Sequence, residues 1–234
     1  IYGAGSSTRL NGSGNSIHVD SSGILNDMTI YNTTLRFNSS MFNVRAVAIR
    51  NQFIPQVILG DISPASTIYF HNCYFITYGV GITQMVVLKN SQNIIFSNSA
   101  FARGPPGFGQ SDVFYLENAN VSQLNVVNTN LFGRIRNVIN VVNSNLSNMN
   151  FLSSFGSAVS FLTADSDSNI LNSTFSNNSL TFDAPEHVFD FKGNNNIITN
   201  NTMIASAPFS SGFAISFEGM RNIINNNRIE GEGT

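Results

Sequence analysis

Apolar and polar residues alternate in short segments that recur along the whole chain. Each segment has the form inward, outward, inward, outward, corner, as in Phe114-Tyr-Leu-Glu-Asn118. Eight segments share this phase, and all sixteen of their inward positions are apolar: 17–21, 47–51, 86–90, 114–118, 139–143, 159–163, 189–193 and 215–219. A period of two residues predicts strands with one buried face. The fifth residue is mostly Asn or Gly, and because these tolerate a left-handed backbone, it predicts a sharp corner.

A second set of strands is predicted after these corners, at residues 28–32, 68–72, 94–98, 124–128, 197–201 and 223–227. Each of them ends in asparagine. We therefore expect one asparagine per turn at a shared corner, where side-chain amides can hydrogen-bond along the stack. The residues of this expected ladder are Asn32, Asn72, Asn98, Asn128, Asn201 and Asn227.

The clearest repeat is the phrase Asn196-Ile-Ile-Thr-Asn-Asn, which returns 26 residues later as Asn222-Ile-Ile-Asn-Asn-Asn. Units that recur at such an interval cannot bury their apolar side alone and are typical of solenoids. The spacing between corresponding inward residues varies from 20 (Ile139 to Val159) to 39 (Val47 to Val86). We expect loops on a third side to absorb this variation. No linker divides the chain, so residues 1–234 are predicted to form one all-β domain.

The Asn-Ile-Ile-x-Asn-Asn phrases at 196–201 and 222–227 resemble the repeats of NosD-type β-helices. The opening Ile1-Tyr-Gly-Ala-Gly-Ser-Ser-Thr-Arg9 is similar to the first turn of phage tailspikes and pectate lyases. On these motifs the chain resembles the pectin-lyase-like superfamily. The resemblance implies a single-stranded right-handed parallel β-helix of about eight turns with variable lateral loops. It implies little about activity, because this fold hosts lyases, hydrolases, adhesins and inert spikes.

Composition narrows the classes of partner. Charged residues make up 10% of the chain and the net charge is −2, which argues against nucleic acid or an anionic membrane surface as a partner. No run of 18 apolar residues occurs, so no membrane span is expected. The single cysteine, Cys73, cannot form an intrachain disulfide and is predicted to be a core residue. Because the chain starts at Ile1 without Met, we interpret it as a processed part or an excerpt of a longer chain.

The asparagine and serine content, 35 and 30 residues, fits a polar-surfaced β-structure. At the last outward position of the first strands, charges of opposite sign fall on neighbouring turns. We expect an exposed ladder of ion pairs there, each contributing ~0.2 to 1 kcal/mol. The expected pairs are Asp20 with Arg50, Lys89 with Glu117, and Lys192 with Glu218.

The sequence contains no assembled catalytic motif, and it predicts no cofactor. Asp165 and Asp167 are a carboxylate pair, the minimum for glycoside hydrolysis, although aspartates at corners ordinarily serve turns. His187 lies beside Glu186 and near Asp183 and Asp190, the densest titratable cluster in the chain. If the protein is an enzyme, Asp165, Asp167, His187 and Asp190 are its candidate catalytic residues. Calcium requires six to eight oxygens, so the isolated Asp190 predicts no metal site.

For sugar binding without catalysis, the best outward candidates are Tyr115 and Asn140 on the next turn. Our first hypothesis is a non-enzymatic extracellular structural or adhesive protein of a cell or virion surface, such as a filament subunit or a spike or fibre segment. It would bind polysaccharide and self-associate through the ends or lateral faces of the β-helix. The alternative is a polysaccharide-degrading enzyme, either a tailspike-type glycosidase or a lyase.

Overall fold

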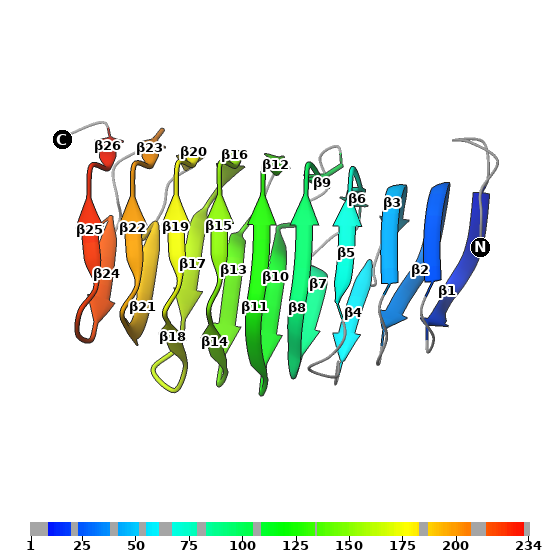
Figure 1. Cartoon of the computed structure of the whole chain (residues 1–234). Coiled ribbons are helices and arrows are strands. Elements are labelled where there is room, and N and C mark those ends of the chain that lie inside the picture. Colours follow the sequence, from blue (N-terminus) through cyan, green and yellow to red (C-terminus); the bar gives the residue numbers. More distant parts are fainter. Residues whose placement is uncertain are drawn as a thin grey trace.

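A computed structural model describes residues 9–19, 23–37, 42–51, 55–60, 67–78, 83–104, 109–133, 135–182, 187–206 and 214–231 (Figure 1). For residues 9–16, 18, 19 and 32 it describes the backbone alone. Within these ranges the protein has 26 strands and no helix, and all the strands belong to one hydrogen-bonded sheet. No helix that could cross a membrane is found in these ranges.

The strands stack in parallel as a β-solenoid, and each turn contributes to three faces. The first face contains β4 (Val57–Gly60), β7 (Thr83–Lys89), β10 (Ser111–Glu117), β13 (Asn137–Val142), β17 (Ser160–Ala164), β21 (Phe189–Asn194) and β24 (Ile215–Glu218). The second contains β5 (Ile68–His71), β8 (Ser91–Ser97), β11 (Asn120–Val127), β15 (Asn150–Leu152), β19 (Thr174–Ser176), β22 (Ile197–Thr199) and β25 (Ile223–Asn225). Two short strands, β14 (Asn145–Ser147) and β18 (Asn169–Leu171), precede β15 and β19.

The third face contains β6 (Tyr74–Thr77), β9 (Ala100–Arg103), β12 (Asn130–Phe132), β16 (Phe155–Ala158), β20 (Ser179–Phe182), β23 (Thr202–Ala205) and β26 (Arg228–Gly231). In Figure 1 the second face lies nearest the viewer with its strands pointing up, and the first face lies behind it with its strands pointing down. The chain meanwhile advances from the N-terminus at the right to the C-terminus at the left. This is a right-handed coil, the hand that crossover connections between parallel strands favour.

The number of turns is about six, against the eight expected. The turns between Thr83 and Gly231 follow one another regularly, and the turn before them, β4 to β6, also has a strand on each face. Ahead of them, β1 (Arg9–Val19), β2 (Gly23–Phe37) and β3 (Phe42–Asn51) run on around the corners instead of breaking there. As a result, β2 pairs with both β3 and β4, and β3 pairs with both β5 and β6.

The expected register of the first face is confirmed at its centre. Val86, Phe114 and Ile139 lie directly over one another. Val159 was predicted to follow them, but Leu162 takes that place and is in turn followed by Phe189. Phe161 and Leu162 are both buried, as are Val113 with Phe114 and Val138 with Ile139, and the second residue of each such pair continues the column.

Val47 was also expected on the first face, and this was wrong. It pairs with Met28 and lies at the corner between the second and third faces. On the first face Leu35 and Val57 precede Val86 instead. The segment at residues 47–51 alternates as well as any other, but β3 continues through the corner and so carries Val47 onto a different side.

Left-handed residues recur five residues apart within a turn, which the sequence reading missed. One turn has them at Asn118, Gln123 and Asn128, with φ of 50°, 56° and 52°; the next has them at Asn143, Asn148 and Ser153, with φ of 46°, 53° and 53°. A new strand starts after each of them except Gln123, which lies within β11. The sequence predicted two corners in a turn, where these two turns have three.

The asparagine ladder exists, but as two columns instead of one. Asn72, Asn98 and Asn128 occupy the left-handed corner, whose members in the last turns are Asn200 and Asn226. Asn201 and Asn227 lie one residue later and turn inward, where Asn201 Nδ2 donates to Asn227 Oδ1 at 2.9 Å. The prediction was off by one residue because consecutive asparagines end both segments and either one fits the pattern. The side chain of Asn32 lies outside the described part.

Candidate binding site on the first face

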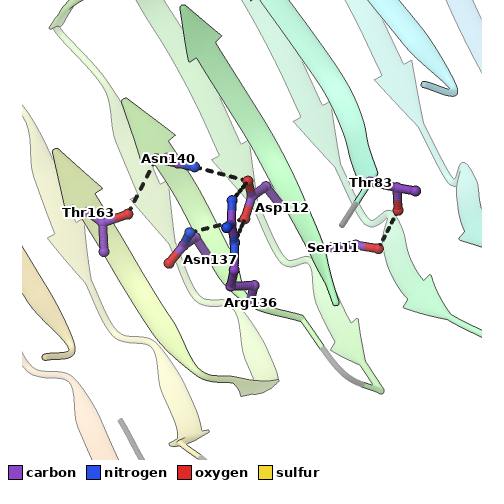
Figure 2. A network of polar contacts seen from close by, with 7 residues as sticks. All are labelled: Thr83, Ser111, Asp112, Arg136, Asn137, Asn140 and Thr163. Atoms are coloured by element: carbon purple, nitrogen blue, oxygen red, sulfur yellow. Dashed lines mark hydrogen bonds and ion pairs between the residues drawn. The ribbon is translucent and has the colours of Figure 1, made fainter. Parts of the chain in front are cut away.

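The densest polar network of the first face is centred on Asp112, in β10 (Figure 2). Its carboxylate is completely buried and accepts four hydrogen bonds. Arg136 Nε donates to Oδ1 at 2.9 Å and Arg136 Nη2 to Oδ2 at 2.5 Å. Asn137 Nδ2 donates to Oδ1 at 3.0 Å and Asn140 Nδ2 to Oδ2 at 2.9 Å. These donors belong to the following turn, which the pairing of Phe114 with Ile139 brings beside Asp112.

The Asp112–Arg136 pair compensates the burial of the carboxylate, because a bidentate guanidinium and two amides replace its water. The hydrogen bond to Asp112 raises the pKa of Arg136, against an opposing effect of partial burial. The Arg136 side chain stays 29% exposed. Asp112 therefore acts as an anchor: its acceptor capacity is used inside the protein, and it holds Arg136 and Asn140 in fixed positions at the surface.

Tyr115 lies beside this network, between Val87 and Asn140 in the register of the first face. Burial raises the pKa of its phenol, and the carboxylates of Glu117 and Asp112 raise it further, while Arg136 lowers it. The Tyr115 hydroxyl hydrogen-bonds with Glu117, and its aromatic ring lies half-buried at the surface.

The outward side chains of the first face form a line along the solenoid, which we call the outward row. Its members are Val87, Tyr115, Asn140, Thr163, Asp190 and Ser216. All are half-buried, and Thr163 Oγ1 donates to Asn140 Oδ1 at 3.5 Å. Because parallel strands are spaced at about 4.8 Å, the row presents hydrogen-bonding groups at a regular interval on a rigid support.

A second polar cluster lies at the start of β7 and β10 and is buried. The hydroxyls of Thr83 and Ser111 are 2.7 Å apart, and Arg103 Nη1 donates to both, at 3.1 and 2.9 Å. Burial lowers the pKa of Arg103, which is 7% exposed. Figure 2 shows Thr83 and Ser111 set apart from the Asp112 network. This cluster holds neighbouring turns together and cannot contact a ligand on the first face.

The candidate catalytic residues do not converge on one another. Asp190 belongs to the outward row, whereas Asp165 and Asp167 are exposed in the turn after β17. Asp165 serves that turn: its Oδ1 accepts from Ser168 Oγ at 2.5 Å and its Oδ2 from the Asn143 N–H at 2.9 Å. His187 lies just before β21. Its expected neighbours Asp183 and Glu186 lie outside the described residues.

The expected ladder of exposed ion pairs was wrong for the residues that can be checked. In the described part of the chain the ion pairs are Asp112–Arg136 and Arg228–Glu230. Lys192 and Glu218 are in register, yet their charged groups do not meet within ion-pair distance. Neither do those of Lys89 and Glu117, and Asp20 lies outside the described ranges. Long side chains on an exposed face gain too little from pairing to be held together.

Sequence reasoning missed Asp112 and Arg136. Both lie ahead of the alternating segments that it used, at the point where a strand begins. The available signal was a charged residue one or two positions before the first apolar residue of a strand, as Asp112 is to Val113 and Arg136 to Val138. Among the residues that the structure describes, no three His, Cys, Asp or Glu side chains gather to hold a metal ion.

Comparison of the chain with protein-family models, with curated proteins and with solved structures finds no match. The fold itself defines the class: a parallel β-solenoid. Its most organised surface in the described part is the outward row with the anchored Arg136 beside it.

Proposed function

We propose that this protein is a non-enzymatic, extracellular structural or adhesive β-helix of a cell or virion surface, whose first face contacts glycan chains. The outward row is the observation that carries the proposal. It combines the aromatic ring of Tyr115 with the amide and hydroxyl groups of Asn140, Thr163 and Ser216 in one line. Sugars are commonly held by such a combination of a ring and hydrogen-bonding groups.

Preorganisation supports this function. Asn140 is held by Asp112 and by Thr163, and Arg136 is held through two of its nitrogens. A ligand therefore does not have to order these side chains, which is a cost of about 0.5 to 1.5 kcal/mol for each flexible side chain. The resemblance of the Asn-Ile-Ile-x-Asn-Asn phrases to carbohydrate-associated β-helices of the pectin-lyase-like superfamily points the same way.

Self-association through the ends or lateral faces is part of the same proposal. On the third face Phe132 and Phe155 are 45% and 50% exposed. Phe155 pairs with Asn130, which lies two residues before Phe132 in β12, so the two phenylalanines are diagonal neighbours on adjacent strands. A second copy of the chain that covers both rings would remove apolar surface from water. Light scattering on the wild type and on a Phe132→Ser/Phe155→Ser variant tests this, and a wild type that stays monomeric at high concentration contradicts it.

Glycan contact is tested by binding to an array of neutral and acidic glycans. We expect Tyr115→Ala to weaken binding at least tenfold, because it removes the ring and the phenol. Tyr74→Ala is the matched control, since Tyr74 is a 38% exposed tyrosine on the third face. Absence of binding by the wild type, or an equal loss in both variants, contradicts a glycan site on the first face.

One observation favours the alternative of a polysaccharide-degrading enzyme: Asp190 places a carboxylate in the outward row itself. Incubation with the same glycans, followed by assays for unsaturated products and new reducing ends, decides between the two functions. Product formation that Asp190→Asn abolishes and Asp167→Asn leaves intact would replace the adhesive function by a catalytic one.

A further inference from the structure

Three side chains of the second face form a hydrogen-bonded triangle that the proposed glycan site does not involve. Ser97 Oγ lies 2.9 Å from His71 Nδ1 and 2.9 Å from the hydroxyl of Tyr69. The Tyr69 hydroxyl is 3.3 Å from His71 Nδ1. The two rings are stacked at 5.7 Å between centroids with an interplanar angle of 21°. The triangle holds the imidazole in one orientation and directs its Nδ1 to Ser97.

The register of the sheet adds a guanidinium to this group. Arg45 of β3 pairs with His71 of β5, which in turn pairs with Ser97 of β8. Arg45 is exposed, and it makes no ion pair with any residue that the structure describes. Among the described residues, the acidic group nearest to Arg45 in register is Asp27, next to the Asn26 that pairs with Arg45. Asp27 Oδ2 accepts a hydrogen bond from Asn26 Nδ2 at 2.7 Å.

The charge distribution of the chain favours an anion at this end. Residues 1–100 contain five basic and three acidic residues, a net charge of +2. Residues 101–234 contain six basic and ten acidic residues, a net charge of −4. The cluster lies in the positive part, whereas the outward row lies largely in the negative part. The net charge therefore favours an anion near the N-terminal turns over the rest of the chain.

We propose that Arg45, His71, Ser97 and Tyr69 form a binding site for an anionic oxygen group such as a phosphate or sulfate ester. The Arg45 guanidinium supplies the charge and a planar fork of N–H donors, which suits a tetrahedral oxyanion. His71 Nε2, which no contact within the described residues uses, supplies a further N–H donor when Nδ1 accepts from the hydroxyls, whose protons stay within the triangle. Stacking of successive turns brings together residues that are 26 positions apart in the sequence, His71 and Ser97 among them.

Isothermal titration of the protein with inorganic phosphate, inorganic sulfate and acetate tests the site. We expect saturable binding of phosphate and sulfate, and weaker binding of the planar acetate. Arg45→Gln should weaken phosphate binding at least tenfold, and His71→Gln should weaken it several-fold. A wild type that binds none of the three anions overturns the proposal.

Lys192→Gln is the matched control, because it removes one positive charge from an exposed residue of the first face. If it weakens phosphate binding as much as Arg45→Gln does, the effect is one of overall charge, and the proposed site is wrong. Circular dichroism and thermal unfolding of each variant establish that the fold is retained. Ser97→Ala is a second test of the site. It breaks the triangle without changing the charge, and we expect it to weaken phosphate binding several-fold. The outcome is independent of the glycan-binding test, which concerns another face.

Discussion

The N-terminal and C-terminal turns fill the same corner of the solenoid in different ways. The position in question follows the left-handed residue between the second and third faces, and we call its members the inner corner column. From the N-terminal to the C-terminal end they are Met28, Val47, Cys73, Ser99, Thr129, Ser154, Asn178, Asn201 and Asn227. The column is apolar or nearly so at first, then carries hydroxyls, and ends in amides.

The polar members bind two turns at once. Ser154 Oγ accepts the N–H of Thr129 at 3.2 Å and donates to the carbonyl of Leu152 at 3.2 Å. Asn201 does the same with separate atoms: Oδ1 accepts the N–H of Asn178 at 3.0 Å, and Nδ2 donates to the carbonyl of Phe175 at 2.9 Å. Backbone groups that turn inward at this corner are thereby satisfied away from water.

The N-terminal turns depend more on aromatic packing. Phe70 and Phe96 stack at 4.5 Å with an interplanar angle of 3°, and Phe75 stacks on Phe101 at 4.8 Å and 10°. Further along, Phe151 meets Phe161 edge-on, at 84°. Apolar packing tolerates several arrangements of similar volume, whereas an amide ladder accepts one register. The C-terminal turns are therefore the more specific in register, and the N-terminal turns depend more on shape.

The largest effect is expected for Phe96→Ala. Phe96 is completely buried and contacts Phe70, Phe75, Phe101 and Phe114. Its truncation leaves a cavity in the aromatic stack and should lower the free energy of unfolding by ~3 to 5 kcal/mol, measured by urea denaturation. Phe132→Ala, at a ring that is 45% exposed, is the control and should cost below ~1 kcal/mol. Similar losses in the two variants would mean that the stack does not carry this stability.

The next largest effect is expected in the amide ladder. Asn201→Ala leaves the N–H of Asn178 and the carbonyl of Phe175 without their partners, which should cost ~2 to 4 kcal/mol in urea denaturation. Asn201→Ser should cost about half as much, because a hydroxyl fills this role at Ser154. Hydrogen exchange at the Asn178 amide should accelerate more in the alanine variant. If serine is no better than alanine, the ladder contributes through packing alone.

A smaller effect concerns the only thiol, which belongs to the inner corner column. Burial raises the pKa of Cys73 from 9.0 to about 12, although hydrogen bonds to backbone groups partly oppose the rise. Above pH 9 the unfolded chain loses this proton while the folded chain keeps it, so stability falls as pH rises towards 12. Between pH 8 and 10.5 the wild type should lose about 2 kcal/mol more than Cys73→Ala does. The measurement is urea denaturation at both pH values. If the wild type and Cys73→Ala lose the same stability between pH 8 and 10.5, the thiol is accessible to water in the folded protein.

The smallest effect is expected at the left-handed corner itself. Asn128 has a φ of 52°, which a β-branched residue strongly disfavours. Asn128→Val should cost ~1 to 2 kcal/mol, whereas Asn128→Gly should be close to neutral. Thermal unfolding of the pair measures the difference. A valine variant as stable as the glycine variant would mean that the corner can relax without cost.

Much of the fold could be predicted because it depends on short sequence patterns within each strand and corner. Alternation at Val86, Phe114 and Ile139 places these residues in the core, and asparagine at positions 90, 118 and 143 marks corners that have a positive φ. The candidate binding site was harder to predict. Tyr115 and Asn140 follow from the register, but Asp112 and Arg136 lie outside the alternating segments, and their pairing depends on which side chains meet across a turn.

The residues alone predicted a parallel β-solenoid, because in–out segments that recur with asparagine corners can bury their apolar side by stacking turn on turn. Tertiary structure decided the register in which unequal turns meet. It placed Leu162 where Val159 was expected, divided the asparagines into an outer and an inner column, and buried Asp112 under Arg136. The physical reason is that a period of two residues is satisfied by several registers, and only hydrogen bonds and packing between turns select one of them.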